Sequence, residues 1–242
     1  MTLEQDLQRM RVQLYALERT ARNLRANLED CMIRHHVDGV QAYSPIPTSL
    51  QALLETNVDI PLQTLEPYYP FHKGVWGSFG EGKDCMKMLV ATRKLRALSP
   101  ASTHLQPPEI SRLTVHPVFD QARQPGWCSL ETEVEVEAFR AAQKIEISLI
   151  SFFDVPEQET AALPASCSMN LRFISKDHSS RDGLTRHFMV TAMPFEQSIV
   201  FEKSHLDSID LSDVTLIVLI LLLPTSGKYT FHLDHFSMKA LD

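Results

Sequence analysis

The sequence lacks a surplus of basic side chains. Its 242 residues carry 23 Lys and Arg against 30 Asp and Glu, which gives a formal net charge of −7 at pH 7. Non-specific binding to nucleic acid draws most of its affinity from Lys and Arg side chains that neutralise phosphates. The charge balance therefore argues against a nucleic-acid partner.

The sequence also lacks a long apolar run. The longest, "VTLIVLILLL" at 214–223, has ten residues, about half of the roughly 20 that a membrane-spanning helix needs. The opening "MTLEQDLQRM" is polar and charged and has no apolar centre of a secretory signal. We expect no membrane span, and we interpret 214–223 as a buried strand.

Cysteine is scarce and scattered. The four cysteines lie far apart and form no C-x-x-C pair: Cys31, Cys85, Cys128 and Cys167. Without a secretory signal, this usage predicts reduced thiols and a cytoplasmic or nuclear protein.

Motifs of known catalytic chemistry are missing as well. There is no G-x-S-x-G sequence, and no cysteine has an evident activating neighbour. No spacing of His and Cys supplies the four ligands of a structural zinc site. We expect a protein that is not an enzyme, with no catalytic residue, no bound metal and no cofactor.

The most regular feature present is a heptad pattern at the N-terminal end. A narrow apolar seam of this kind, with polar residues on the other faces, is typical of a coiled coil rather than of a helix packed on its own domain. We predict that residues 1–38 form a coiled-coil helix, ended near Gly39, that pairs with itself or with another chain. The predicted partner-binding positions are spaced alternately by four and three residues: Leu3, Leu7, Met10, Leu14, Leu17, Ala21, Leu24, Leu28 and Cys31.

Residues 39–109 read as a helical and proline-rich connecting region. "TSLQALLETN" at 48–57 predicts a short capped helix, and "KDCMKMLVATRKLRAL" at 83–98 predicts a second helix. An aromatic stretch lies between them. We expect it to cover an edge of the core, with a partner-binding surface as the alternative; its members are Tyr68, Tyr69, Phe71 and Trp76.

Residues 110–242 read as strands. "ETEVEVEAF" at 131–139 alternates apolar and acidic residues, and we interpret it as one strand with Val134, Val136 and Ala138 on one side. About eight strands follow one another with turn-forming residues between them and almost no helical pattern. This predicts an antiparallel, jelly-roll-like β-sandwich and a mainly-β protein with some α-helix.

One glycine-rich stretch can be interpreted either as a phosphate-binding loop or as a tight turn. Gly77, Gly82 and Lys83 have the spacing of a phosphate-binding loop, G-x-x-x-x-G-K. That loop needs a Ser or Thr after the lysine and a preceding apolar strand, whereas here Asp84 follows and "PFHKGVW" precedes. We interpret the glycines as a tight turn into the helix predicted at 83–98, with Asp84 as its N-cap, and an NTPase as the least favoured hypothesis.

The last predicted strand contains "FHLDHF". Alternation places His232 and Asp234 on one face and His235 on the other, beside buried apolar neighbours. The ten residues "YTFHLDHFSM" resemble the closing strand of carbohydrate-binding jelly-roll modules. This resemblance implies a β-sandwich that holds a glycan or calcium, and it identifies no ligand residue.

Two hypotheses about function follow. The first is a non-enzymatic assembly or adaptor subunit, which oligomerises or recruits a partner through its coiled coil and presents a recognition surface on its sandwich. The second is a carbohydrate- or ion-binding sandwich made multivalent by the coiled coil. The residues do not identify the partner.

Overall fold

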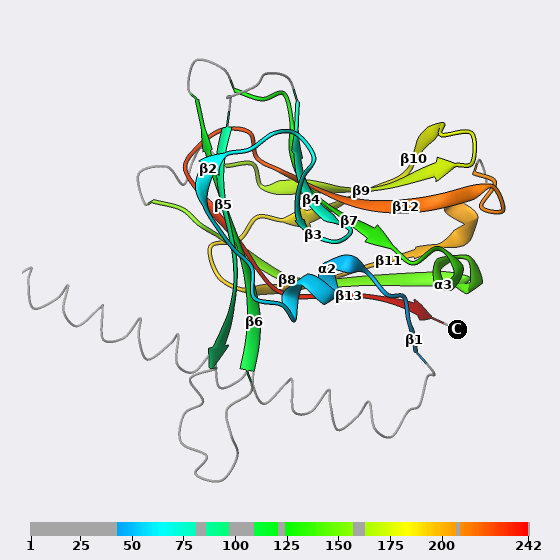
Figure 1. Cartoon of the computed structure of the whole chain (residues 1–242). Helices are drawn as coiled ribbons and strands as arrows, with labels where there is room; N and C mark the ends of the chain where they lie inside the picture. The colour runs from blue at the N-terminus through cyan, green and yellow to red at the C-terminus, as the bar shows by residue number, and fades with distance from the viewer. Residues whose placement is uncertain are drawn as a thin grey trace, which may run out of the picture. The chain divides into compact units, whose positions relative to one another are not determined.

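Two antiparallel sheets packed face to face make up the structure, a computed structural model (Figure 1). It describes residues 43–80, 86–96, 109–120, 124–156, 163–206 and 209–241. The predicted coiled-coil helix at 1–38, with its nine partner-binding positions, lies outside the described residues. The prediction of a mainly-β antiparallel sandwich is confirmed.

Sheet A has the strand order β11-β8-β13-β6-β5-β2, with β1 paired to β13. Its strands are β1 Ser44–Pro45, β2 Asp59–Thr64, β5 Met86–Arg96, β6 Glu109–Phe119, β8 Lys144–Asp154, β11 Phe195–Glu202 and β13 Thr230–Leu241. Sheet B has the order β10-β9-β12-β7-β4-β3. Its strands are β3 Tyr69–His72, β4 Val75–Phe79, β7 Cys128–Val134, β9 Ser166–Ser175, β10 Ser180–Met189 and β12 Val214–Leu223.

In the described residues, three short helices join the strands: α2 Ser49–Leu54, α3 Val136–Ala141 and the 3-10 helix η2 Lys203–Leu206. None of the described helices has the length and apolar character that crossing a membrane requires. The apolar run at 214–223 is the strand β12, between β9 and β7, as predicted.

The core forms because inward-facing residues alternate along each strand. In β8, Ile145, Ile147, Leu149 and Phe153 are buried, while Lys144 and Asp154 at the strand ends are exposed. An antiparallel strand directs successive side chains to opposite faces, so this spacing covers one face of sheet A with apolar groups. Sheet B presents the matching apolar face, and the two faces pack against each other.

The helix predicted at 83–98 is wrong, because β5 occupies 86–96. Met86, Met88 and Val90 are buried at a period of two. The segment pairs in continuous register with β6, from Met86 opposite Phe119 to Arg96 opposite Glu109. The sequence fits both periods, and the pairing with β6 decides for the strand.

The single strand predicted at 131–139 is also wrong. The strand β7 ends at Val134 and the helix α3 begins at Val136. The carboxylate of Glu135 accepts hydrogen bonds from the backbone N–H groups of Glu137 (3.1 Å) and Ala138 (2.5 Å). Glu135 is thus an N-cap that ends the strand and starts the helix.

The connecting region at 39–109 contributes more to the sandwich than predicted. The capped helix at 48–57 is confirmed as α2, and Thr48 forms a capping box with Gln51. However, β1 to β5 belong to the same two sheets as the later strands. The sandwich therefore extends over one compact unit from Tyr43, rather than from residue 110.

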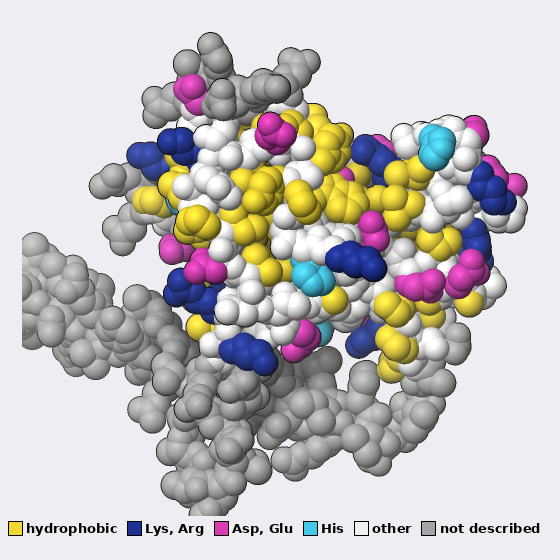
Figure 2. Space-filling model, viewed as in Figure 1, with side chains coloured by type: hydrophobic (Ala, Val, Ile, Leu, Met, Phe, Trp, Pro, Cys, Tyr) yellow, Lys and Arg dark blue, Asp and Glu magenta, His cyan; other side chains and the backbone are white. Residues whose placement is uncertain are grey.

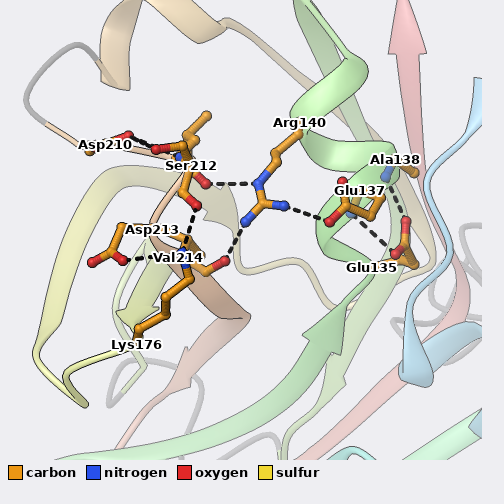
Figure 3. Close-up of polar contacts among 10 residues, drawn as sticks. Glu135, Glu137, Ala138, Arg140, Lys176, Asp210, Ser212, Asp213 and Val214 are labelled. Carbon is orange, nitrogen blue, oxygen red and sulfur yellow. Dashed lines mark hydrogen bonds and ion pairs between the residues drawn. The ribbon is translucent and has the colours of Figure 1, made fainter.

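The helix α3 is held against the segment that leads into β12. The Arg140 guanidinium donates hydrogen bonds to the backbone carbonyls of Leu211 (2.7 Å) and Val214 (2.5 Å), and it also contacts the carboxylate of Glu137 (Figure 3). Asp210 accepts from the backbone N–H and the hydroxyl of Ser212 in the same segment. These contacts satisfy backbone and side-chain polar groups of the segment before β12, and we assign them a structural role.

Candidate functional site

The glycine stretch does not form a phosphate-binding loop in the described residues. Gly77 lies inside β4, Lys83 lies outside the described residues, and the next described element is the strand β5 instead of a helix. The predicted helix N-cap, Asp84, lies outside the described residues, and the segment that it was expected to cap is the strand β5. A Cβ on Gly77 would lie 2.5 Å from Cζ of Phe71, so Gly77 leaves room for the Phe71 ring.

The predicted aromatic stretch is divided between the core and the surface. Phe71 is buried in β3, which covers the edge of the core as expected. Tyr68 is 61% exposed and has a φ of +64°, a conformation that a tyrosine rarely adopts. Trp76 points away from the core in β4 and is half-buried, so the stretch is only partly taken up by the core.

The cluster in "FHLDHF" is a polar network on the outer side of sheet A. Arg112 binds Asp234 through two hydrogen bonds of 2.6 and 2.8 Å. The ring of His232 stacks on Phe152 at 4.5 Å between centroids, and its Nδ1 lies 3.1 Å from the hydroxyl of Thr114. Among the described residues, no group of His, Cys, Asp and Glu side chains could hold a metal ion.

The predicted opposite orientation of His235 is wrong. A register irregularity between Leu233 and His235 shifts the strand by one residue. His232 lies opposite Phe152 and His235 opposite Ile150, two residues on the same side of β8. Both histidines therefore lie on the outer side of sheet A.

Because of these two histidines, we expect the folded protein to lose stability in acid. Burial, with Arg112 beside His232 and Lys239 beside His235, lowers the pKa of both rings below the ordinary value of 6.5. The unfolded chain then binds more protons than the folded one as the pH falls below about 6.5. We expect the free energy of unfolding, measured with urea, to decrease between pH 7.5 and pH 5, and the double variant His232→Gln, His235→Gln to show a shallower decrease. An unchanged slope would contradict this assignment.

The outer face of sheet B carries a second and more extensive polar arrangement. Residues in register on antiparallel strands point to the same side. One cross-strand row runs Trp76, Glu131, Ile220, Asn170 and Thr185 over β4, β7, β12, β9 and β10. The adjacent row runs Glu133, Val218, Arg172 and Asp182. We call these two rows the outer face of sheet B.

Glu131 fixes the orientation of Trp76 in the first row. Its Oε2 accepts a hydrogen bond from the indole Nε1–H of Trp76 (2.9 Å), and its Oε1 accepts one from the hydroxyl of Ser129 (2.8 Å). Glu131 is only 4% exposed although it points away from the core. A carboxylate shielded from water holds its donors firmly, so the indole has a defined position.

Arg172 and Asp182 form the polar part of the second row. The guanidinium donates to both carboxylate oxygens, at 2.7 and 3.2 Å. The hydrogen bond to Asp182 raises the pKa of Arg172, with smaller contributions from Glu131 and Tyr68. Both side chains are partly open to solvent, so their planar groups can bind a ligand.

An unused acceptor completes the face. The Oδ1 atom of Asn170 is buried and has no hydrogen-bond partner within the described part of the chain, and the same holds for the hydroxyl of Ser78 in β4. Buried polar atoms usually have a partner. Asn170 lies in the same row as Trp76 and Glu131, and its Oδ1 atom is shielded from solvent beneath this face.

On its visible side, the molecule has no surface of one charge. Figure 2 shows apolar side chains gathered across the middle of this face, with acidic and basic side chains intermingled around them.

The residues singled out from the sequence include only part of the polar rows on the outer face of sheet B. The aromatic stretch includes Trp76 but not Glu131, which lies 55 residues away in sequence. The alternation in "SLETEV", with Ser129, Glu131 and Glu133 on one side, is the signal that could have identified an outward polar row. The predicted partner-binding positions at 3–31 lie outside the described residues.

Comparison with known proteins gives no family assignment. No protein-family model matches the chain, and no curated protein matches it. Among solved structures, it is similar to a family 11 carbohydrate-binding module of a Clostridium thermocellum cellulase, with 10% identity, a TM-score of 0.38, and coverage of 76% of this chain and 96% of that one.

Two further solved structures are similar to the same extent. The CBM22-1 xylan-binding domain from Paenibacillus barcinonensis has 10% identity, a TM-score of 0.38 and coverage of 77% and 97%. A family 30 carbohydrate-binding module of another Clostridium thermocellum cellulase has 13% identity, a TM-score of 0.37 and coverage of 77% and 99%. These likenesses assign no ligand and no residue role to the chain.

Proposed function

We propose that the sandwich is a non-catalytic carbohydrate-binding module whose ligand lies on the outer face of sheet B. The observation that carries this proposal is the Trp76 indole, held by the shielded carboxylate of Glu131 within a row of polar side chains. Neither group is needed to seal the core, since both point away from it. An oriented indole beside fixed polar groups is a ligand-recognition arrangement.

The chemistry of the face matches that of a sugar. A pyranose ring has apolar C–H faces that pack on an aromatic ring, and hydroxyl groups that both donate and accept hydrogen bonds. Trp76 offers the ring, and the Arg172–Asp182 pair, which is partly open to solvent, offers planar donors and acceptors. Flat rows across several strands suit an extended ligand.

The heptad pattern supports a second candidate function. The four-three spacing of the positions at 3–31 supports assembly with a partner chain. Such an assembly would place several sandwiches in one particle and raise the apparent affinity for a repetitive glycan. The adaptor hypothesis and the glycan-binding hypothesis are therefore compatible.

A glycan microarray probed with the intact chain, followed by calorimetric titration of the best-bound oligosaccharide, tests the proposal. We expect Arg172→Ala to weaken binding about tenfold, because it removes a charged donor worth about 1.5 kcal/mol. The matched control is Arg93→Ala, which removes an exposed arginine from β5 in sheet A and should leave the affinity unchanged. Absence of binding to any glycan, or equal losses in both variants, would refute it.

A further inference from the structure

A cavity of about 640 Å³ opens at one end of sheet A, away from the outer face of sheet B. It lies where β6 and β8 end and β13 begins, and it includes the turn that precedes β13. Cavities of roughly 300–1,000 Å³ are the size at which proteins enclose small organic ligands. No residue of the two polar rows of sheet B lines it.

Part of the cavity wall is apolar. Pro117, Phe119, Tyr229 and Pro156 line it. The Tyr229 hydroxyl donates to the carbonyl of Pro224 (2.6 Å), and its ring lies 6.3 Å from that of Phe119. Prolines and fixed rings present flat apolar surfaces, which suit a flat apolar ligand.

The ring of His116 determines which polar group the ligand must carry. Its Nδ1 lies 3.0 Å from the backbone carbonyl of Tyr229 and 3.0 Å from the hydroxyl of Thr230. A carbonyl oxygen can only accept, so a hydrogen bond to the Tyr229 carbonyl requires the proton on Nδ1, and this tautomer leaves Nε2 as an acceptor. A ligand that reaches Nε2 of this tautomer donates a hydrogen bond to it.

The charged residues of the lining offset each other. Asp154 and Lys228 both line the cavity, and they carry opposite charges. Besides His116, the polar lining side chains are Gln124 and Thr230, which are uncharged. This balance favours a ligand without net charge over an anion or a cation.

We propose that this cavity binds a small uncharged aromatic alcohol, whose ring lies against the proline and aromatic walls and whose hydroxyl donates to Nε2 of His116. It is a second binding site, independent of the glycan site on sheet B. The aromatic ring of such a ligand matches the apolar part of the wall, and its hydroxyl matches the acceptor at Nε2 of His116.

Two probes that differ only in the donor test the proposal: 4-methylphenol, and 4-methylanisole, in which a methyl group replaces the hydroxyl hydrogen. We expect an NMR titration of the intact chain, labelled at its valine methyl groups, to give an affinity about five- to tenfold higher for 4-methylphenol, the value of one hydrogen bond. The methyl signals of Val118, which lines the cavity, should shift, and those of Val200 on β11 should not.

Variants separate the donor effect from general apolar binding. His116→Phe should make the two probes bind equally, whereas the control His205→Phe, at an exposed position in η2, should keep the difference. Val118→Trp, at a position 40% exposed, should fill the cavity without unfolding the protein and abolish binding. Equal affinities for both probes in the native protein, a shift at Val200 alone, or displacement of 4-methylphenol by cellobiose would each overturn the proposal.

Discussion

Replacing Phe139 with alanine should remove about 3–5 kcal/mol from the free energy of unfolding, a typical loss for a large side chain cut back within a packed core. Phe139 is fully buried and is the only buried residue of α3. Its ring lies 5.7 Å from that of Phe173 in sheet B and 6.4 Å from that of Phe201 in sheet A. The truncation would leave a cavity between the two sheets, which cannot collapse without moving both.

Urea unfolding followed by circular dichroism measures this loss. The midpoint should fall while the slope against urea stays the same, because the surface exposed on unfolding is nearly unchanged. The control is Glu137→Ala on the same helix, whose side chain is 75% exposed and whose ion pair with Arg140 should contribute well under about 1 kcal/mol. A loss below about 1 kcal/mol for Phe139→Ala would mean that α3 is not part of the sandwich core.

Phe139 also illustrates where the sequence predicts the fold and where it does not. The pattern of turns and short strands indicated an antiparallel sandwich, and the structure confirms it. At 131–139, however, the alternation of valine and glutamate continues across the boundary between β7 and α3. The strand ends because the Glu135 carboxylate caps the helix, and a glutamate in an alternating stretch gives no sign of that role.

The helix prediction for the segment at 86–96 was wrong for a related reason. Its apolar residues satisfy a helical period as well as a period of two, so local pattern leaves both open. The choice depends on β6, which begins more than ten residues later and pairs with the whole of β5. Pairing of this kind is a tertiary property, and no window of the sequence contains it.

The candidate site on sheet B is harder still to predict from sequence. Its first row takes one residue from each of five strands, in an order that does not follow the chain. A shift of one residue in any strand would send that residue into the core. Only the register brings Trp76 to Glu131 and Asn170 to the same row, so single motifs could not reveal the site.

Truncation of Trp76 to alanine should cause the largest loss of glycan affinity, at least about 2 kcal/mol or roughly 30-fold, because a tryptophan in a binding surface is a typical hot spot. The variant should keep its fold, since Trp76 points away from the core in β4. Calorimetric titration against the same oligosaccharide as for Arg172→Ala measures the effect, with circular dichroism as the check on folding. An affinity within twofold of the native value would place the ligand elsewhere.

Variants of Glu131 test whether its carboxylate acts by orienting the Trp76 indole or by contacting the ligand itself. Glu131→Leu leaves the Nε1–H of Trp76 without its acceptor, and we expect about tenfold weaker binding as the ring becomes free to rotate. In a Trp76→Phe background there is no N–H to hold, so the same substitution should cost much less. Equal costs of Glu131→Leu in the two backgrounds would mean that the carboxylate acts without the indole, and the argument that a preoriented tryptophan carries recognition would then be wrong.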